Sequence, residues 1–271
     1  DGWAFHTARW DYSKTGGAPG QPLTGLADQS VALVGTGASG LQCLPGLAEA
    51  AKHVYVFQRT PSTVDERNNT ATDPEWAKTL QPGWQKERQR NFHSWTFEGM
   101  ALGQPDLVCD FWTELGRNMT ARIAASPDPA GLGIEEIMAI REEEDYKIME
   151  RLRRRIAAIV ADPDTAETLK PYYRFMCKRP TSSETYLTAF NLPNVTLVDV
   201  SESKGVERLT EKGIVANGVE YEVDCVVFAS GFAGCLPRFG AWPLPIGLPA
   251  GITLEAPASF SRRAVIGSSL E

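Results

Sequence analysis

Residues 30–40 read SVALVGTGASG, and this pattern limits the folds that the chain can adopt. The opening apolar run is typical of a strand that is covered on both faces, as strands of a parallel sheet are. A helix is predicted from about Ser39 to Ala51, and HVYVF at residues 53–57 predicts a second strand. Strand, glycine turn, helix and strand make a βαβ unit, so we expect an α/β protein with a Rossmann-like domain on a parallel sheet.

The glycines of this turn have the spacing G-x-G-x-x-G. The first glycine permits a tight turn, the second lets the backbone approach a pyrophosphate, and the third lets helix and strand pack closely. The amino terminus of the helix also presents free N–H groups and a positive dipole to phosphates. The alternative is a turn that only packs tightly. The predicted dinucleotide-binding residues are Gly35, Thr36, Gly37, Ala38, Ser39, Gly40 and Gln42.

The end of the second predicted strand indicates which dinucleotide would bind. A carboxylate here would bind a ribose 2′-hydroxyl and indicate NAD, but Gln58 occupies that place. Arg59 supplies a planar charge suited to a 2′-phosphate, and Thr60 adds a hydroxyl. We therefore expect NADP, with a solvated surface arginine as the alternative interpretation of Arg59.

Composition excludes several classes of function. The 271 residues include 27 Lys and Arg against 34 Asp and Glu, a net charge of −7, which disfavours a general nucleic-acid-binding protein. We see neither a signal peptide nor an apolar run near the roughly 20 residues of a membrane helix, so we expect a soluble, cytoplasmic protein. The 5 cysteines and 3 histidines are scattered, which predicts reduced thiols and no metal site.

The middle of the chain is predicted to be mainly helical. Residues 61–132 give an irregular pattern of helices and loops, and residues 134–160 show clear helical periodicity. Two pairs of opposite charge at i,i+4 spacing support the long helix, Glu143 with Lys147 and Glu150 with Arg154. The acidic run at 141–145 and the basic run at 151–155 are interpreted as a solvated helix face rather than as binding patches.

Short strands are predicted towards the end of the chain. They cover residues 194–200, 206–210, 213–218 and 224–232, with a hairpin through residues 211–213. The last 39 residues are rich in proline and glycine and show weak periodicity.

The beginning of the chain resembles a known fingerprint. GWAFHTARWD at residues 2–11 matches F-x-G-x-x-x-H-x-x-x-W-[P/D] of the Baeyer–Villiger monooxygenases, apart from the first Phe, through Gly2, His6, Trp10 and Asp11. Three further stretches are similar to the same family, and the resemblance extends to about residue 232. These stretches are VYVFQRTP at 54–61, the segment 162–199, and DCVVFASGF at 224–232, where Ser230 replaces the usual Thr.

The resemblance implies an NADPH- and FAD-dependent monooxygenase that converts a ketone to an ester or lactone with oxygen, through a peroxyflavin. It implies that Arg179 stabilises the peroxyflavin and the developing oxyanion. It also implies that Lys178 and Arg59 hold the 2′-phosphate, with Thr60 beside them, and that the loop of His6 couples domain movement to catalysis. Small-molecule ketone and oxygen are the implied partners.

The sequence also departs from the family. The glycine-rich unit that binds FAD in such enzymes is not seen, so we expect a partial chain with an incomplete FAD site. Two alternatives follow, an NADP-binding fragment without activity and an N- or S-oxygenating flavin monooxygenase. A hydride-transferring dehydrogenase explains neither the fingerprint nor Lys178 and Arg179.

Four parts of the chain are predicted. The fingerprint and an interdomain linker occupy residues 1–29. The NADP-binding domain comprises residues 30–65 and 176–228, interrupted by a helical insertion at 66–175. Residues 229–271 would be a remnant of the return to an FAD domain, or a divergent tail.

Overall fold

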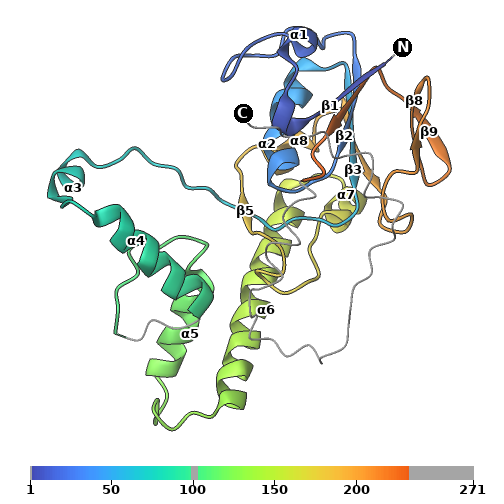
Figure 1. Cartoon of the computed structure of the whole chain (residues 1–271). Helices are drawn as coiled ribbons and strands as arrows, with labels where there is room; N and C mark the ends of the chain where they lie inside the picture. Colours follow the sequence, from blue (N-terminus) through green and yellow to red (C-terminus); the bar gives the residue numbers. More distant parts are fainter. Residues whose placement is uncertain (1, 99–102, 232–271) are drawn as a thin grey trace, which may run out of the picture. The chain divides into compact units, whose positions relative to one another are not determined.

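A computed structural model describes residues 2–98 and 103–231. The chain divides into one compact unit, Asp1–Ala229, and a second, Ser230–Glu271. Phe232 and the proline- and glycine-rich last 39 residues lie outside the described residues. Figure 1 shows the first unit in colour.

The first unit is built on a parallel five-stranded sheet with the strand order β1-β10-β2-β3-β6. All four neighbouring pairs of strands are parallel. The strands are β1 (Trp3–His6), β2 (Ser30–Val34), β3 (His53–Gln58), β6 (Val195–Asp199) and β10 (Cys225–Phe228). The predicted α/β class with a parallel sheet is confirmed.

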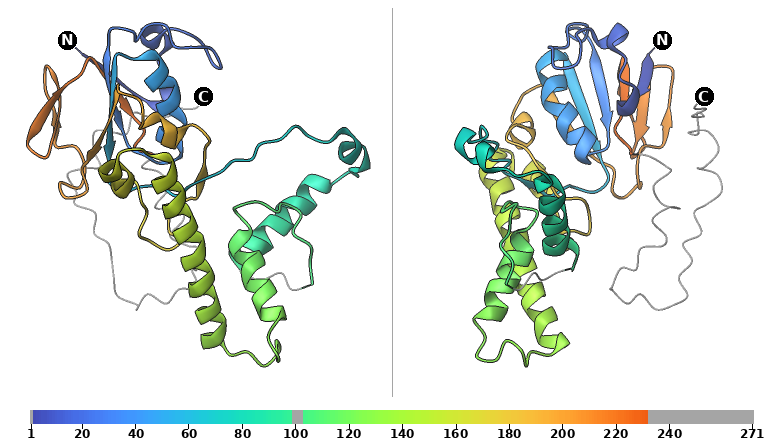
Figure 2. Two further views of the ribbon diagram at one scale, coloured as in Figure 1. Left: turned by 180° about the vertical axis from the view of Figure 1, so that it is seen from behind. Right: turned by 60° about the vertical axis from the view of Figure 1, so that its left-hand side comes forward.

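Helices cover one face of this sheet, where α2 (Ala38–Ala50) and α8 (Tyr186–Ala189) lie (Figure 1). The right-hand view of Figure 2 shows α2 lying along the strands. The core on this side contains Val31, Leu33, Val54, Val56, Leu41, Leu44 and Leu47. These apolar contacts explain why β2 and β3 lack polar alternation, because the opposite face is buried as well.

A small antiparallel sheet covers that opposite face. It consists of β7 (Arg208–Leu209), β8 (Gly213–Ala216) and β9 (Val219–Glu222). Its Ile214 and Ala216 pack with Ala32, Phe57 and Val226 of the main sheet. We expected one strand over residues 213–218, but the chain turns back at Asn217 and Gly218, whose φ angles of 52° and 73° are left-handed. Asn-Gly favours this hairpin turn, and the prediction overlooked it.

Helices dominate the segment between β4 (Val64–Asp65) and β5 (Thr181–Ser182), two short strands that pair in parallel. The helices are α3 (Pro74–Thr79), α4 (Trp84–His93), η2 (Ser94–Glu98), α5 (Glu114–Ala124), α6 (Ile134–Ile159) and α7 (Pro163–Thr168). A separate apolar cluster joins α5 and α6 through Leu115, Met119, Ile148, Met149 and Leu152, together with Phe175. The remaining short elements are η1 (Thr7–Arg9) and α1 (Tyr12–Thr15).

The charged runs of α6 form a solvated face only in part, because Glu142, Glu143 and Arg154 are exposed and other members are not. Glu144 and Asp145 are buried, with 5% and 6% exposure. Arg151 makes a bidentate contact of 2.7–2.8 Å with the buried carboxylate of Asp65 and also pairs with Glu114 at 2.7 Å. These contacts fasten α6 to β4 and α5.

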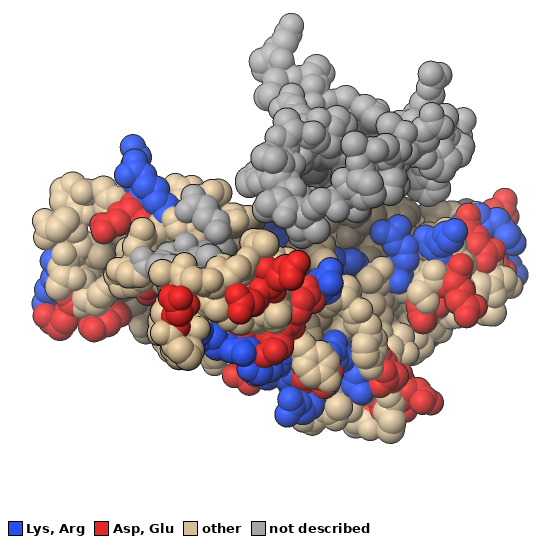
Figure 3. All heavy atoms as spheres, turned by 90° about the horizontal axis from the view of Figure 1, so that it is seen from below, with Lys and Arg blue, Asp and Glu red and all other residues tan. Residues whose placement is uncertain are grey.

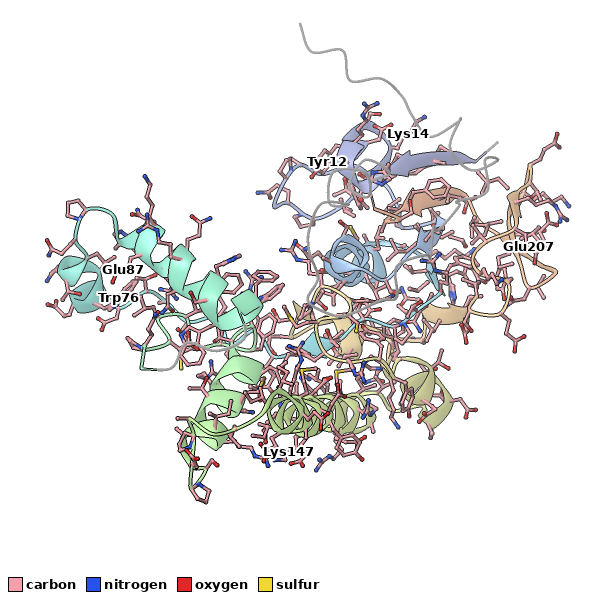
Figure 4. The ribbon with its side chains drawn as sticks, turned by 60° about the horizontal axis from the view of Figure 1, so that its bottom comes forward. Tyr12, Lys14, Trp76, Glu87, Lys147 and Glu207 are labelled. Atoms are coloured by element: carbon pink, nitrogen blue, oxygen red, sulfur yellow. The ribbon has the colours of Figure 1, made fainter. Side chains whose placement is uncertain are left out.

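The charge pairs within α6 also differ from the prediction. Lys147, labelled in Figure 4, pairs with Glu144 at 2.7 Å, while Glu143 pairs with Arg122 of α5. Glu150 pairs with Arg153 rather than with Arg154. In both cases the pair that forms has i,i+3 spacing. Of the predicted i,i+4 partners, Glu143 pairs with Arg122 instead, and Arg154 donates to the Glu150 backbone carbonyl.

Candidate functional site

The glycine turn lies where β2 ends and α2 begins. Gly35 has φ +105°, a conformation that glycine adopts easily, and its N–H donates to the Phe57 carbonyl at 3.0 Å. A Cβ on Gly40 would lie 2.0 Å from the Gly35 carbonyl oxygen. The fold itself therefore requires these two glycines, one for the turn and one for the contact between helix and strand.

Gly37 is different, because no neighbour in the described part of the chain explains its lack of a side chain. It precedes α2 with φ −72° and ψ −170°, which any residue adopts, and a Cβ there would meet no described atom within 4 Å. Among residues 2–98 and 103–231, no side chain caps the amino terminus of α2, and its first turn contains no acidic residue. The turn thus offers free space beside unpaired N–H groups, which suits a pyrophosphate.

Thr36 and Thr60 connect the two loops at this edge of the sheet. Thr36 is buried, and its hydroxyl donates to the Thr60 carbonyl at 3.3 Å. Ser62 donates to the Thr36 carbonyl at 2.7 Å, a contact that the sequence analysis did not identify. The Thr36 side chain is therefore turned into the protein, so only its backbone is available to a ligand. Gln42 likewise bonds its own helix, donating to the Ala38 carbonyl at 2.8 Å.

Gln58 does not present its amide to a ribose. Its side chain is 1% exposed, and its Nε2 donates to the Thr168 carbonyl at the end of α7 at 2.8 Å. Its Oε1 is buried without a hydrogen-bond partner among the described residues. Gln58 thus joins β3 to α7, and the next residue, Arg59, is exposed at the edge of the sheet.

Lys178 and Arg59 bring two positive charges to one region. Burial lowers the pKa of Lys178, and the charge of Arg59 lowers it further. Among the residues that the structure describes, neither cation has a carboxylate within 4.0 Å. A phosphate dianion between them would relieve their repulsion, so the predicted pairing of these residues is electrostatically sound.

Arg179 is exposed, and its guanidinium carbon lies 5.7 Å from the centroid of the Trp112 ring. The ring of Tyr173 lies 5.7 Å from the Lys178 Nζ. The two cations of the loop before β5 therefore contact different aromatic residues. The two cations were predicted from the sequence, but their aromatic partners were not, because both are distant in sequence from the glycine turn.

The fingerprint residues shape the end of β1. His6 Nδ1 accepts a hydrogen bond from the Ala8 N–H at 3.1 Å, and the Trp10 indole donates to the buried Thr15 hydroxyl at 3.0 Å. Asp11 caps α1, the helix of Tyr12 and Lys14 in Figure 4, by accepting from the Ser13 N–H at 3.0 Å. These contacts build a turn on the sheet edge rather than a catalytic cluster.

The strand register places these groups at one edge of the sheet. His6 pairs with Phe228, Phe228 with Val34, and Val34 with Phe57, so the carboxyl ends of four strands align. Gly2 lies at the opposite edge, where a Cβ would come 3.1 Å from the Asp224 carbonyl oxygen. The chain changes direction across the sheet between β2 and β10, and ligands of such sheets bind at this switch point.

Other features of the described residues give no competing site. A shallow hollow of about 330 Å³ lies at the opposite edge beside Gly2 and Asp224, and one of about 250 Å³ lies beside Trp76 and Glu87 (Figure 4).

Within residues 2–98 and 103–231 no group of acidic, His and Cys residues could hold a metal ion. None of the described helices has both the length and the apolar character of a membrane span. Acidic and basic side chains alternate over the face in Figure 3.

Comparison of the sequence with known proteins gives clear relatives. No family model matches the chain. A neopentalenolactone D synthase from Streptomyces avermitilis is 52% identical over 235 residues, which are 85% of this chain and 38% of that protein. The Baeyer–Villiger monooxygenase ATR8 from Stachybotrys chlorohalonatus is 49% identical over 235 residues, 85% of this chain and 36% of that protein.

Solved structures show the same relationship. A polycyclic ketone monooxygenase from the fungus Thermothelomyces thermophila has a TM-score of 0.73 and 41% identity, over 85% of this chain and 37% of that one. OTEMO in complex with FAD and NADP has a TM-score of 0.60 and 26% identity, over 85% of this chain and 42% of that one. The chain thus spans well under half the length of the proteins that it matches.

Proposed function

Because the chain is homologous to part of the Baeyer–Villiger monooxygenases, we propose that it is the NADPH-binding part of an NADPH- and FAD-dependent monooxygenase. Such an enzyme would convert a small-molecule ketone to an ester or lactone with oxygen. The observation that supports this proposal most is the glycine turn, where the open space at Gly37 meets an uncapped helix amino terminus. The cations Arg59 and Lys178 stand near one another on two adjoining loops.

Each part of the site has a distinct role toward NADPH. The N–H groups of Ala38 and Ser39, at the start of α2, would bind the pyrophosphate. Arg59 and Lys178 would bind the 2′-phosphate, whose charge compensates the desolvation and the repulsion that lower the pKa of Lys178. NADH lacks that phosphate, so this pair selects NADPH.

Flavin, when bound, would supply the two-electron chemistry that passes oxygen to the ketone. The described residues contain one G-x-G-x-x-G turn, Gly35 to Gly40, and that turn is assigned here to NADPH. Arg179 has a permanent positive charge and is exposed, and it would stabilise negative charge that develops on oxygen during the reaction. Its contact with Trp112 would limit the orientations of the guanidinium.

One experiment tests the proposal on the whole 271-residue chain. The purified protein is titrated with NADPH and NADH, then mixed with FAD, desalted and examined for visible absorbance. We expect NADPH to bind more tightly than NADH. Retained flavin would justify an oxygenation assay with a cyclic ketone, and lactone formation would support the full activity. Equal affinity for both nucleotides would contradict the assignment of the phosphate site.

A second candidate is an NADP-binding module that performs no redox chemistry alone. The glycine turn and the cations Arg59 and Lys178 would serve this candidate equally well, because they concern NADPH alone. Tight NADPH binding without retained flavin or oxygen consumption would support this candidate. The cytoplasmic location and the four-part domain division stay predictions.

A further inference from the structure

Tyr173 contacts both loops that supply the candidate phosphate-binding cations. Its hydroxyl donates to the Pro61 carbonyl at 2.9 Å, two residues after Arg59. Its ring lies 5.7 Å from Nζ of Lys178. It also packs against the apolar cluster of α5 and α6. A single side chain thus connects the loop after β3, the loop before β5 and the helical segment.

The chemistry of Tyr173 suits a fixed support. Burial raises the pKa of its hydroxyl to about 12, so the group remains protonated and can donate to Pro61 throughout the neutral range. The pKa of Lys178 is lowered instead, because burial and the charge of Arg59 both disfavour its ammonium form. An aromatic face beneath a partly desolvated cation offsets part of that penalty. Without it, Lys178 would turn towards solvent and away from Arg59.

The neighbouring Tyr172 provides a matched comparison. It is 69% exposed, and its hydroxyl bonds Glu167 on the surface. Its ring lies 5.1 Å from the guanidinium carbon of Arg153 in α6, so it contacts a cation outside the candidate site. The two adjacent tyrosines therefore differ in what they support, although both combine a hydroxyl contact with a cation–π contact.

We propose that Tyr173 is a positioning residue for coenzyme selection, which holds Lys178 and Arg59 at the spacing that receives a 2′-phosphate. This inference rests on the proposed function, because it assumes that the two cations bind NADPH. It also adds to that function, because it places part of the selectivity in a residue that itself touches no phosphate.

Dissociation constants for NADPH and NADH test the inference on the whole chain. Tyr173→Phe removes the bond to Pro61 and keeps the ring, so we expect NADPH to bind about 3- to 10-fold more weakly. Tyr173→Leu removes both contacts, and we expect a loss of about 10- to 30-fold. NADH affinity should change less than about twofold in both variants, and Tyr172→Phe should leave both affinities unchanged.

A second comparison separates positioning from general damage. In a Lys178→Ala background, Tyr173→Leu should weaken NADPH binding less than it does in the wild-type chain, because the part of its effect that acts through Lys178 is already lost and only the part that acts through Pro61 and Arg59 remains. Equal losses for NADPH and NADH, or full additivity with Lys178→Ala, would overturn the inference. Tyr173→Phe keeps the packing of the ring, so it remains a valid test even if Tyr173→Leu fails to fold. Unchanged selectivity for NADPH over NADH in Tyr173→Phe would overturn the role assigned to the hydroxyl. A wild-type chain without preference for NADPH would refute the proposed phosphate site itself, and the inference with it.

Discussion

Replacing Gly37 or Gly40 by alanine should separate coenzyme binding from stability within one turn. In Gly40→Ala the new Cβ meets the Gly35 carbonyl oxygen at 2.0 Å and its carbon at 3.0 Å, both backbone atoms that cannot rotate away. Overpacking of this kind costs about 1–3 kcal/mol or more. For a unit of this size the melting temperature should fall by about 2–12 °C.

Gly37→Ala should behave in the opposite way. Its backbone angles suit alanine, and no atom lies within 4 Å of the new methyl group. The poorer helix cap is offset by the smaller entropy of the unfolded chain, so the free energy of unfolding should change by less than about 1 kcal/mol. The methyl group would occupy the approach to the pyrophosphate. Losing one charged hydrogen bond there, about 1.5–3 kcal/mol, would weaken NADPH binding about 10- to 100-fold.

Thermal unfolding by circular dichroism and NADPH titration by calorimetry measure the two quantities on the same samples. We expect opposite outcomes, with Gly40→Ala unstable and Gly37→Ala stable but weak in NADPH binding. Wild-type affinity in Gly37→Ala would show that the pyrophosphate does not approach this turn. A loss of stability as large as that of Gly40→Ala would show that the space beside Gly37 is not open.

Three further outcomes follow from the charged groups. The pKa of Lys178 is below its ordinary value of 10.5. As the pH rises through that lowered pKa, Lys178 loses its charge, so the ratio of NADPH to NADH affinity should fall. A ratio that stays unchanged up to pH 10.5 would contradict this expectation. Arg151→Leu leaves the buried carboxylate of Asp65 without its bidentate partner. It should lower the free energy of unfolding in urea by about 2–3 kcal/mol, less than for a fully buried pair because Arg151 is half-exposed. A loss below about 1 kcal/mol would show that the stability of the chain does not depend on this pair. Burial raises the pKa of Asp145, so its charged form opposes folding above that pKa. Asp145→Asn should therefore raise the free energy of unfolding at neutral pH, and this gain should disappear in acid. A gain that persists in acid would point to another cause.

The sequence was most informative where local pattern and packing agree. The apolar runs of β2 and β3 and the glycine turn between them predict the βαβ unit because both faces of these strands are buried. It was less informative for side chains whose partners are distant in sequence. Gln58 appeared to replace a ribose-binding acid, yet its amide bonds the Thr168 carbonyl, 110 residues away.

The charged runs of α6 show the same limit. Periodicity places these residues on a helix but does not show that Asp65, before the helical segment, pairs with Arg151. The solvated-face interpretation holds for Glu142, Glu143 and Arg154 but was wrong for Glu144 and Asp145, because the partners that bury a side chain cannot be read from the helix alone. Tyr173 was missed for a related reason, since Pro61, which accepts the hydrogen bond of its hydroxyl, lies 112 residues earlier in the chain.

The strand order has a consequence for the order in which the chain can fold. Strand β2 can pair with β3 early, but its other neighbour, β10, lies about 194 residues further along, as the bond from the Ser30 N–H to the Asp224 carboxylate illustrates. Among the described residues, the strand that pairs with β1 is β10. Since contacts of such long sequence separation form late, β1 should join this sheet later than β2 and β3 pair with each other. During synthesis, the segment around Trp3 and Trp10 must therefore wait until residues 225–228 have been made.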